Sequence, residues 1–497
     1  MYKKLFLQIF SIGILTIFLF SGFLTKDDPA WAVTPLKLDP SNVLSEYNTY
    51  LPFVMTPIQP TIFGAETRRG GVYHIQKAQE ANLYWSRYGG FNWNEIEPVR
   101  TDPPTYHWES VDDNALLEAS QRGLTIIAII RYTPAWAQKI PGVACGPVAE
   151  DALDAFAEFV GTSVERYGVQ PYNIKYWEIG NEPDVDPSLV LPDHPFGCWG
   201  DKYDEFYGGG YYALMLKHVY PAIKTEKPDA KLLNGGLLLD CNPTNDDAYL
   251  PGQFFEDILA NQGANYFDIV SFHAWPSYYG TLFWEKNDSK WRKRGGIVLG
   301  KIDFLREIMR LYGVDKPIIQ TEGALGCPPG LPLDYNPLQV VLGFQGGEMP
   351  DYNPFCNPPV DAYYEAQADY IVWLFVRNWA QGLWGTAWYQ LEAPGWFNAG
   401  LINPDLTPRR AYYALKFLTE ELSSSDYVGV VPDPNLRVYE FDTSDKRIWV
   451  LWSPDEHEYP ITIPGNTQNL YDKYGNTINT QGGQIIVKSP IYIEMTK

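Results

Sequence analysis

Two glutamates follow apolar, β-rich runs that lie far apart in the sequence. Glu182 comes shortly after the run 174–179, and Glu322 comes shortly after the run 317–320. Two carboxyl groups ~5–5.5 Å apart can break an acetal bond in two steps, because one protonates the leaving oxygen while the other attacks the anomeric carbon. If the fold brings this pair together, we expect Glu182 to act as acid and base and Glu322 as nucleophile.

The elements that would position this pair repeat as apolar strand followed by amphipathic helix. Eight β-rich runs occur at 61–65, 83–88, 124–130, 174–179, 231–234, 268–272, 317–320 and 385–389. Helical periodicity occupies the intervals, for example at 111–122, 149–167, 211–224, 302–312 and 363–379. The alternation predicts an α/β fold, a (β/α)8 TIM barrel over residues 61–422. A doubly wound open sheet is the alternative, but no glycine-rich phosphate motif follows the first strand.

In a TIM barrel, functional side chains lie at the carboxyl ends of the strands. Glu182 and Glu322 follow the fourth and seventh strands, so we expect them to face one another across the barrel mouth. From residue 423 to 497 the pattern changes to short alternating runs separated by turns, which predicts a small antiparallel β-sandwich. The segment 33–60 is a candidate for one additional strand of this sandwich.

Several strand ends together resemble one group of enzymes. The matching stretches are Tyr84-Trp85-Ser86-Arg87, Trp177-Glu178-Ile179-Gly180-Asn181-Glu182-Pro183, Ser271-Phe272-His273-Ala274-Trp275 and Thr386-Ala387-Trp388-Tyr389. They resemble the clan A retaining glycoside hydrolases, nearest to the β-xylosidase/α-iduronidase family, with the endo-glucanase/mannanase family as a close alternative. The resemblance implies a glycosidase that hydrolyses O-glycosyl bonds and needs no cofactor.

The same resemblance assigns roles to polar residues beside the pair. It implies that Arg87 keeps Glu322 ionised and that Asn181 donates a hydrogen bond to the sugar 2-hydroxyl, a bond that strengthens at the transition state. His273 would position the nucleophile, although a buried histidine with satisfied hydrogen bonds is an equally good interpretation.

Aromatic residues make up 15% of the chain, and flat sugar faces stack on such rings. The resemblance places Trp388 at a sugar subsite, against the alternative that it is an ordinary core tryptophan. Trp93 after the second strand and Tyr278 after the sixth are further candidates for substrate contacts.

The five cysteines follow strands on the predicted catalytic face. Cys327 and Cys356 bracket the loop after the seventh strand, so a disulfide between them would staple that loop beside Glu322. One pair is expected among the remaining three, and Cys145–Cys198 is the pair we favour over pairings with Cys241. No spacing of cysteine or histidine suggests a metal site.

Residues 1–32 have the features of an export signal, namely two early lysines, an apolar run and Ala30-Trp31-Ala32 as a cleavage site. An uncleaved membrane anchor is the alternative, because the apolar run approaches the ~20 residues that span a bilayer. We therefore expect a secreted or cell-surface protein. The net charge of −22 and the pI near 4.7 make nucleic acid and anionic membrane surfaces poor partners.

These features predict a secreted retaining glycoside hydrolase that cleaves β-glycosidic bonds of oligo- or polysaccharides through a covalent glycosyl-enzyme. Two alternatives remain open at this point. A transglycosylase would use the same two glutamates with a sugar acceptor in place of water. A non-catalytic carbohydrate-binding surface protein would keep the barrel without turnover.

Overall fold

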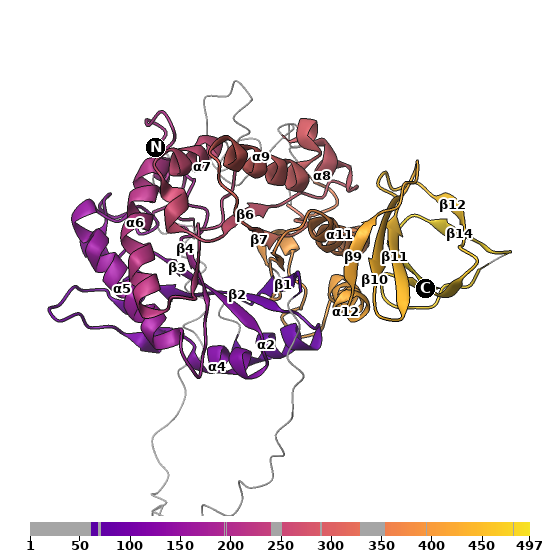
Figure 1. The fold of residues 1–497 in the computed structure, drawn as a ribbon, viewed down its shortest axis with the longest axis horizontal. Coiled ribbons are helices and arrows are strands. Elements are labelled where there is room, and N and C mark those ends of the chain that lie inside the picture. Colours follow the sequence, from indigo (N-terminus) through magenta and orange to yellow (C-terminus); the bar gives the residue numbers. More distant parts are fainter. Residues whose placement is uncertain are drawn as a thin grey trace, which may run out of the picture. The chain divides into compact units, whose positions relative to one another are not determined.

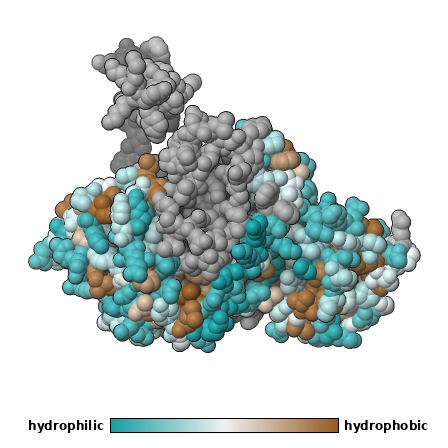
Figure 2. Space-filling model, turned by 90° about the horizontal axis from the view of Figure 1, so that it is seen from above, coloured by the Kyte–Doolittle hydropathy of each residue, from teal (hydrophilic) through white to brown (hydrophobic). Residues whose placement is uncertain are grey.

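A computed structural model of the chain describes residues 61–67, 71–192, 194, 196–239, 251–288, 291–328, 353–393, 395–480 and 482–497. The predicted export signal, the segment 33–60 and Cys241 lie outside the described residues. Among the helices that are described, none has both the length and the apolar character needed to cross a membrane. On the face in Figure 2, the visible hydrophobic residues are interspersed with hydrophilic ones.

The eight predicted strands form one parallel sheet that closes on itself. They are β1 (Phe63–Glu66), β2 (Trp85–Asn92), β3 (Thr125–Arg131), β4 (Tyr176–Ile179), β5 (Lys231–Leu233), β6 (Val270–Ala274), β7 (Ile318–Gly323) and β8 (Gly385–Trp388). β1 pairs with both β2 and β8, and a parallel bridge between Leu233 and Ile269 joins the β5 side to the β6 side. The predicted TIM barrel is therefore confirmed (Figure 1).

Helices surround the strands because each buries one apolar stripe. The helices are α2 (Gly71–Glu80), α3 (Trp93–Ile96), α4 (Asp113–Gln121), α5 (Leu153–Tyr167), α6 (Gly209–Glu226), α7 (Pro251–Ala260), α8 (Phe283–Asn287), α9 (Ile297–Leu311), α11 (Asp361–Ala380) and α12 (Arg410–Leu422). In α5 the buried residues Phe156, Val160 and Val164 recur every fourth position, which is the spacing of a single helix face.

The side chains inside the barrel form layers that are stacked along the barrel axis. The polar residues form the layer nearest to the carboxyl ends of the strands. Trp85, Ile127, Leu233, Ile269 and Ile319 form a separate apolar cluster. Side chains two positions apart in a strand point to the same face. Arg87 and Thr321 therefore lie one layer above Trp85 and Ile319, toward the carboxyl ends of the strands. The apolar layer supports a charged layer at the barrel mouth.

The C-terminal part forms antiparallel sheets, as predicted. Its strands are β9 (Asp426–Val430), β10 (Arg437–Asp442), β11 (Lys446–Trp452), β12 (Tyr459–Thr462), β13 (Thr467–Asp472), β14 (Gln484–Val487) and β15 (Ile491–Thr496). Five of them make one sheet in the order β13-β15-β11-β10-β9, and β12 pairs with β14. The larger sheet packs on α11, where Trp373 stacks on Trp452 with ring centroids 5.7 Å apart.

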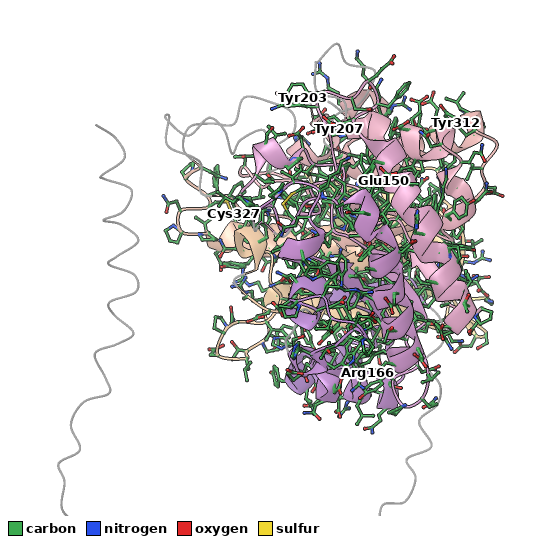
Figure 3. All side chains as sticks on the ribbon, turned by 90° about the vertical axis from the view of Figure 1, so that its left-hand side faces the viewer. Glu150, Arg166, Tyr203, Tyr207, Tyr312 and Cys327 are labelled. Atoms are coloured by element: carbon green, nitrogen blue, oxygen red, sulfur yellow. A yellow bond between two sulfur atoms is a disulfide. The ribbon has the colours of Figure 1, made fainter. Side chains whose placement is uncertain are left out.

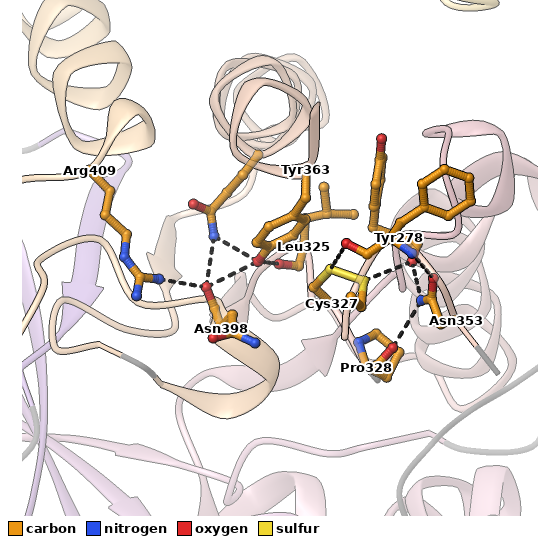
Figure 4. The surroundings of a disulfide bond; sticks show 11 residues. Tyr278, Leu325, Cys327, Pro328, Asn353, Tyr363, Asn398 and Arg409 are labelled. Carbon is orange, nitrogen blue, oxygen red and sulfur yellow. Dashed lines mark hydrogen bonds between the residues drawn. A yellow bond between two sulfur atoms is a disulfide. The ribbon is translucent and has the colours of Figure 1, made fainter. Parts of the chain in front are cut away.

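Both disulfides that the sequence suggested are present in the structure. Cys145 pairs with Cys198 at a Cα–Cα distance of 5.3 Å, and Cys327 pairs with Cys356 at 5.2 Å. The first joins the loops after β3 and β4. The second ties the segment after β7 to the start of α11, beside Tyr278 and Asn353 (Figure 4).

Candidate active site

A buried arginine contacts side chains at the ends of several strands, and together they form one charged cluster. Arg87 of β2 is 1% exposed and donates through Nε to Glu178 at 2.6 Å. Its Nη1 donates to Glu66 at 2.8 Å and also to Glu322. Its Nη2 donates to Oδ1 of Asn181 at 2.8 Å. One guanidinium therefore contacts three carboxylates, which come from β1, β4 and β7.

Glu182 and Glu322 face one another on either side of His273. Nδ1 of His273 lies 2.8 Å from Oε1 of Glu182 and 3.7 Å from Oε2 of Glu322. One oxygen from each glutamate and a ring nitrogen of His273 all lie within 4.8 Å of one another. The sequence predicted this juxtaposition from strand ends alone.

The backbone at Glu182 is held in an uncommon conformation. After β4 the chain turns through Gly180, at φ 87°, and Glu182 itself has φ 54°. Left-handed backbone is costly for a residue with a Cβ and persists where surrounding contacts enforce it. Here the Glu182 N–H donates to the Gly235 carbonyl at 2.8 Å. The turn directs Glu182 into the mouth instead of along the strand.

The charge of Glu322 depends on more groups than Arg87, which the resemblance assigned to keep it ionised. Burial raises the pKa of the Glu322 carboxyl above its ordinary value, Arg87 lowers it, and the carboxylates of Glu66 and Glu178 raise it further. Arg87 carries one positive charge that three carboxylates share, so it offsets the burial of Glu322 only in part. Burial and the two neighbouring carboxylates therefore outweigh Arg87, and the pKa of Glu322 lies above its ordinary value.

Trp388 does not lie where a sugar platform was expected. Its side chain is fully buried, its Nε1 donates to the Ala399 carbonyl at 2.9 Å, and its ring is 6.3 Å from Tyr370 of α11. Trp388 thus points outward from the barrel, and this corrects the assignment. Tyr389 follows on the opposite face of the chain, is partly exposed and contacts Trp275 with ring centroids 4.8 Å apart. Tyr389 replaces Trp388 as the aromatic candidate at the mouth.

Trp93 and Tyr278 are also buried, and their contacts are with other residues. Trp93 is 1% exposed, donates to Glu97 at 2.8 Å and packs against Phe156 of α5. Tyr278 is 3% exposed, and its ring lies 5.6 Å from that of Tyr363 (Figure 4). Both rings pack among other side chains, and a role for them in substrate binding stays a prediction.

Two residues of the site were not predicted. Glu66 ends β1, and the rule that identified Glu182 and Glu322, a carboxylate at a strand end, applies to it as well. Thr321 lies between His273 and Glu178, with its hydroxyl 3.1 Å from His273 Nε2 and 2.8 Å from Glu178 Oε1. No local sequence signal distinguishes Thr321, because its partners come from two other strands.

No protein-family model matches this sequence, and no curated protein sequence matches it. Solved structures do resemble the fold. A family 39 glycoside hydrolase from the gut symbiont Bacteroides cellulosilyticus aligns with a TM-score of 0.63 and 16% identity, over 89% of this chain and 82% of that chain. A monomeric β-xylosidase from Caulobacter crescentus gives 0.54 and 14%, over 88% and 96%.

A family 30 endoxylanase from Clostridium papyrosolvens aligns with a TM-score of 0.53 and 11% identity, over 88% of this chain and 97% of that chain. At these identities the likeness shows a shared fold. The chain therefore has the fold of these glycoside hydrolases.

Proposed function

We propose that the protein is a retaining glycoside hydrolase that cleaves β-glycosidic bonds of oligo- or polysaccharides. The observation that carries the proposal is the separation of the two carboxyl groups, whose nearest oxygens lie within 4.8 Å. Retaining glycosidases place their carboxyls ~5–5.5 Å apart, whereas inverting enzymes leave ~6.5–9.5 Å for a water molecule. The gap between Glu182 and Glu322 suits direct attack on the sugar.

The proposed reaction uses the groups at the mouth in sequence. Glu182 protonates the leaving oxygen while Glu322 attacks the anomeric carbon and forms a glycosyl ester. Glu182, now ionised, takes a proton from water, which attacks the same carbon and releases Glu322. Arg87 turns the Asn181 carbonyl oxygen toward itself, and we assign the amide Nδ2 of Asn181 to the sugar 2-hydroxyl.

The stereochemistry of the first product tests this proposal. Proton NMR during hydrolysis of an aryl β-glycoside is expected to show the β-anomer first, with the α-anomer appearing only by mutarotation. The α-anomer as first product would overturn the retaining mechanism. Glycosides formed in preference to hydrolysis when a sugar acceptor is added would favour the transglycosylase. Glycan binding by folded protein without any turnover would favour the binding protein.

We also propose export from the cytoplasm. Two disulfides support it, since such bonds persist mainly in oxidising compartments. N-terminal sequencing of the protein from its native host is expected to show a chain that begins near residue 33. A mature chain that retains residues 1–32 would contradict cleavage and favour the anchor.

A groove with aromatic residues in its lining includes part of the loop that follows Glu182, and we assign it to the binding of an extended substrate. It has a volume of about 750 Å³ and lies among the loops after β3 and β4 and helix α7. Trp199 lines it and donates its backbone N–H to the Pro183 carbonyl at 2.9 Å, which connects the groove to the acid/base loop. Tyr203, 88% exposed, lies at its edge near Tyr207 (Figure 3).

The charge of the groove selects against acidic glycans. Its lining includes five carboxylates against a single lysine, Lys139. The carboxylates are those of Asp186, Asp201, Asp204, Glu205 and Asp257. Carboxylates accept hydrogen bonds from sugar hydroxyls but repel uronate or sulfate groups. The proposed substrate is therefore a neutral glycan chain.

Tyr203→Ala is expected to weaken the use of long substrates and spare short ones. Loss of one stacking ring is worth about 1 kcal/mol, so KM for a neutral oligosaccharide should rise about fivefold. The kinetics of a short aryl glycoside should stay at the parent level, because that substrate does not reach the groove. Tyr413→Ala, at a ring 51% exposed on α12, is the matched control. Equal effects on both substrates, or none on either, would contradict a role for the groove.

A further inference from the structure

We propose that Thr321 is a positioning residue that sets the tautomer of His273 and thereby keeps a proton on Glu182. The inference rests on the proposed function, because it explains how that acid/base residue is held in its acidic form. It follows from the direction of a chain of hydrogen bonds that runs from Glu178 through Thr321 and His273 to Glu182.

The first link fixes the hydroxyl hydrogen of Thr321. Glu178 is fully buried and ion-paired with Arg87 Nε at 2.6 Å, so its carboxylate only accepts hydrogen bonds. Its Oε1 lies 2.8 Å from the Thr321 hydroxyl. A hydroxyl has a single hydrogen, and this contact uses it. Thr321 therefore has only its oxygen lone pairs to offer to any other partner.

The second link fixes the imidazole. His273 Nε2 lies 3.1 Å from the Thr321 oxygen, so Nε2 must carry the hydrogen that this bond needs. Burial lowers the pKa of the His273 ring well below its ordinary value, and the positive charges of Arg87 and Lys301 lower it further, which favours the neutral imidazole. A neutral imidazole has one N–H, which leaves Nδ1 as an acceptor.

The third link places the proton on Glu182. Its Oε1 lies 2.8 Å from His273 Nδ1. A nitrogen without hydrogen and a carboxylate oxygen repel one another at that distance, so one of the two must carry a hydrogen. His273 Nδ1 carries none, because the single ring hydrogen is on Nε2. The carboxylic acid form of Glu182 supplies it. This chain of hydrogen bonds, which we call the relay, thus stabilises the protonated form of Glu182 that the first step of glycoside cleavage requires.

The other charged groups around the relay act on Glu322 in opposite directions. Arg87 contacts Glu322 directly and lowers its pKa, whereas burial and the carboxylates of Glu66 and Glu178 raise the pKa of Glu322. Lys301 of α9 donates to the backbone carbonyl of His273 at 3.0 Å, and its positive charge lowers the pKa of the ring. Buried Asp184, two residues after Glu182, accepts from the backbone of the loop after β5. The relay acts on Glu182 through His273, and Arg87 is the group that favours the ionised form of Glu322.

The kinetic test is Thr321→Val, which keeps the shape of the side chain and removes the hydroxyl. His273 is then free to carry its hydrogen on Nδ1 and donate to Glu182, which favours the ionised carboxylate. The alkaline limb of the kcat/KM profile should move to lower pH by about one unit, the size of one hydrogen bond to a charged group. Thr321→Ser, which restores the hydroxyl, should return the limb toward the parent position.

Thr386→Val is the matched control. Thr386 is an equally buried residue of β8 whose hydroxyl accepts from Asn378, away from the carboxylates. The alkaline limb of the kcat/KM profile of Thr386→Val should lie at the same pH as that of the parent protein. If the alkaline limb of folded Thr321→Val stays at the pH of the parent, the relay is wrong. The relay is also wrong if Thr321→Ser and Thr386→Val displace the limb as far as Thr321→Val does.

The tautomer can also be measured without a substrate. Nitrogen-15 NMR of protein labelled at its six histidines, with Thr321→Val to assign the affected ring, is expected to show one buried imidazole protonated at Nε2 alone. A ring protonated at Nδ1, or at both nitrogens, would overturn the relay while leaving the proposed function intact. Absence of turnover in the parent would overturn the proposed function, and the NMR result would still decide the tautomer.

Discussion

Glu322→Gln is expected to abolish turnover, with kcat lowered about 10⁴-fold or more on every glycoside tested. Glutamine has nearly the shape of glutamate but a far weaker nucleophilic oxygen, so the glycosyl ester cannot form. Activated leaving groups should not restore the rate, because their departure still requires attack at the anomeric carbon. Kinetics with an oligosaccharide and a dinitrophenyl glycoside, measured side by side, check this result.

The same substitution should leave the fold intact. Glu322 is buried beside Glu66 and Glu178, so removing its charge relieves repulsion while the amide oxygen still accepts from Arg87. We expect the thermal midpoint to stay level or rise, as happens when a strained functional site is neutralised. Glu109→Gln, at a side chain 77% exposed, is the control for the chemical change itself. Turnover above one hundredth of the parent rate would rule out Glu322 as the nucleophile.

The barrel and the placement of Glu182 near Glu322 were predictable because both depend on strand ends. Eight apolar runs with helices between them leave few alternative topologies, and the carboxyl ends of parallel strands meet at one face. Glu182 and Glu322 could be identified without any knowledge of their distance. The same rule identifies Glu66, which ends the first strand one residue beyond the predicted run 61–65.

The orientation of individual strand residues was not predictable in the same way. Strands of a barrel are buried on both faces, so β8 shows no alternation of polar and apolar residues that would mark its inner side. Trp388 and Tyr389 are therefore equivalent in the sequence, and only contacts with α11 and Trp275 distinguish them. Thr321 depends on the same three-dimensional closure, since its hydroxyl joins residues from β4 and β6.

Glu182→Gln should behave differently from Glu322→Gln, because its effect depends on the leaving group. An alkoxide is a poor leaving group without a proton, so kcat/KM on an oligosaccharide should fall about 10²–10⁴-fold. A dinitrophenolate leaves without help, so formation of the glycosyl-enzyme from that substrate should remain close to the parent rate.

The second step then becomes rate-limiting, because water lacks its base. Rapid mixing of Glu182→Gln with the dinitrophenyl glycoside is expected to show a burst of dinitrophenolate equal to the enzyme concentration, followed by slow turnover. Azide, which needs no base, should accelerate the slow phase and yield the β-glycosyl azide. Equal losses on both substrates, without burst or azide rescue, would mean that Glu182 is not the acid/base. Because Glu322→Gln should show neither response, the pair of variants also distinguishes the two roles and would reveal them if they were exchanged.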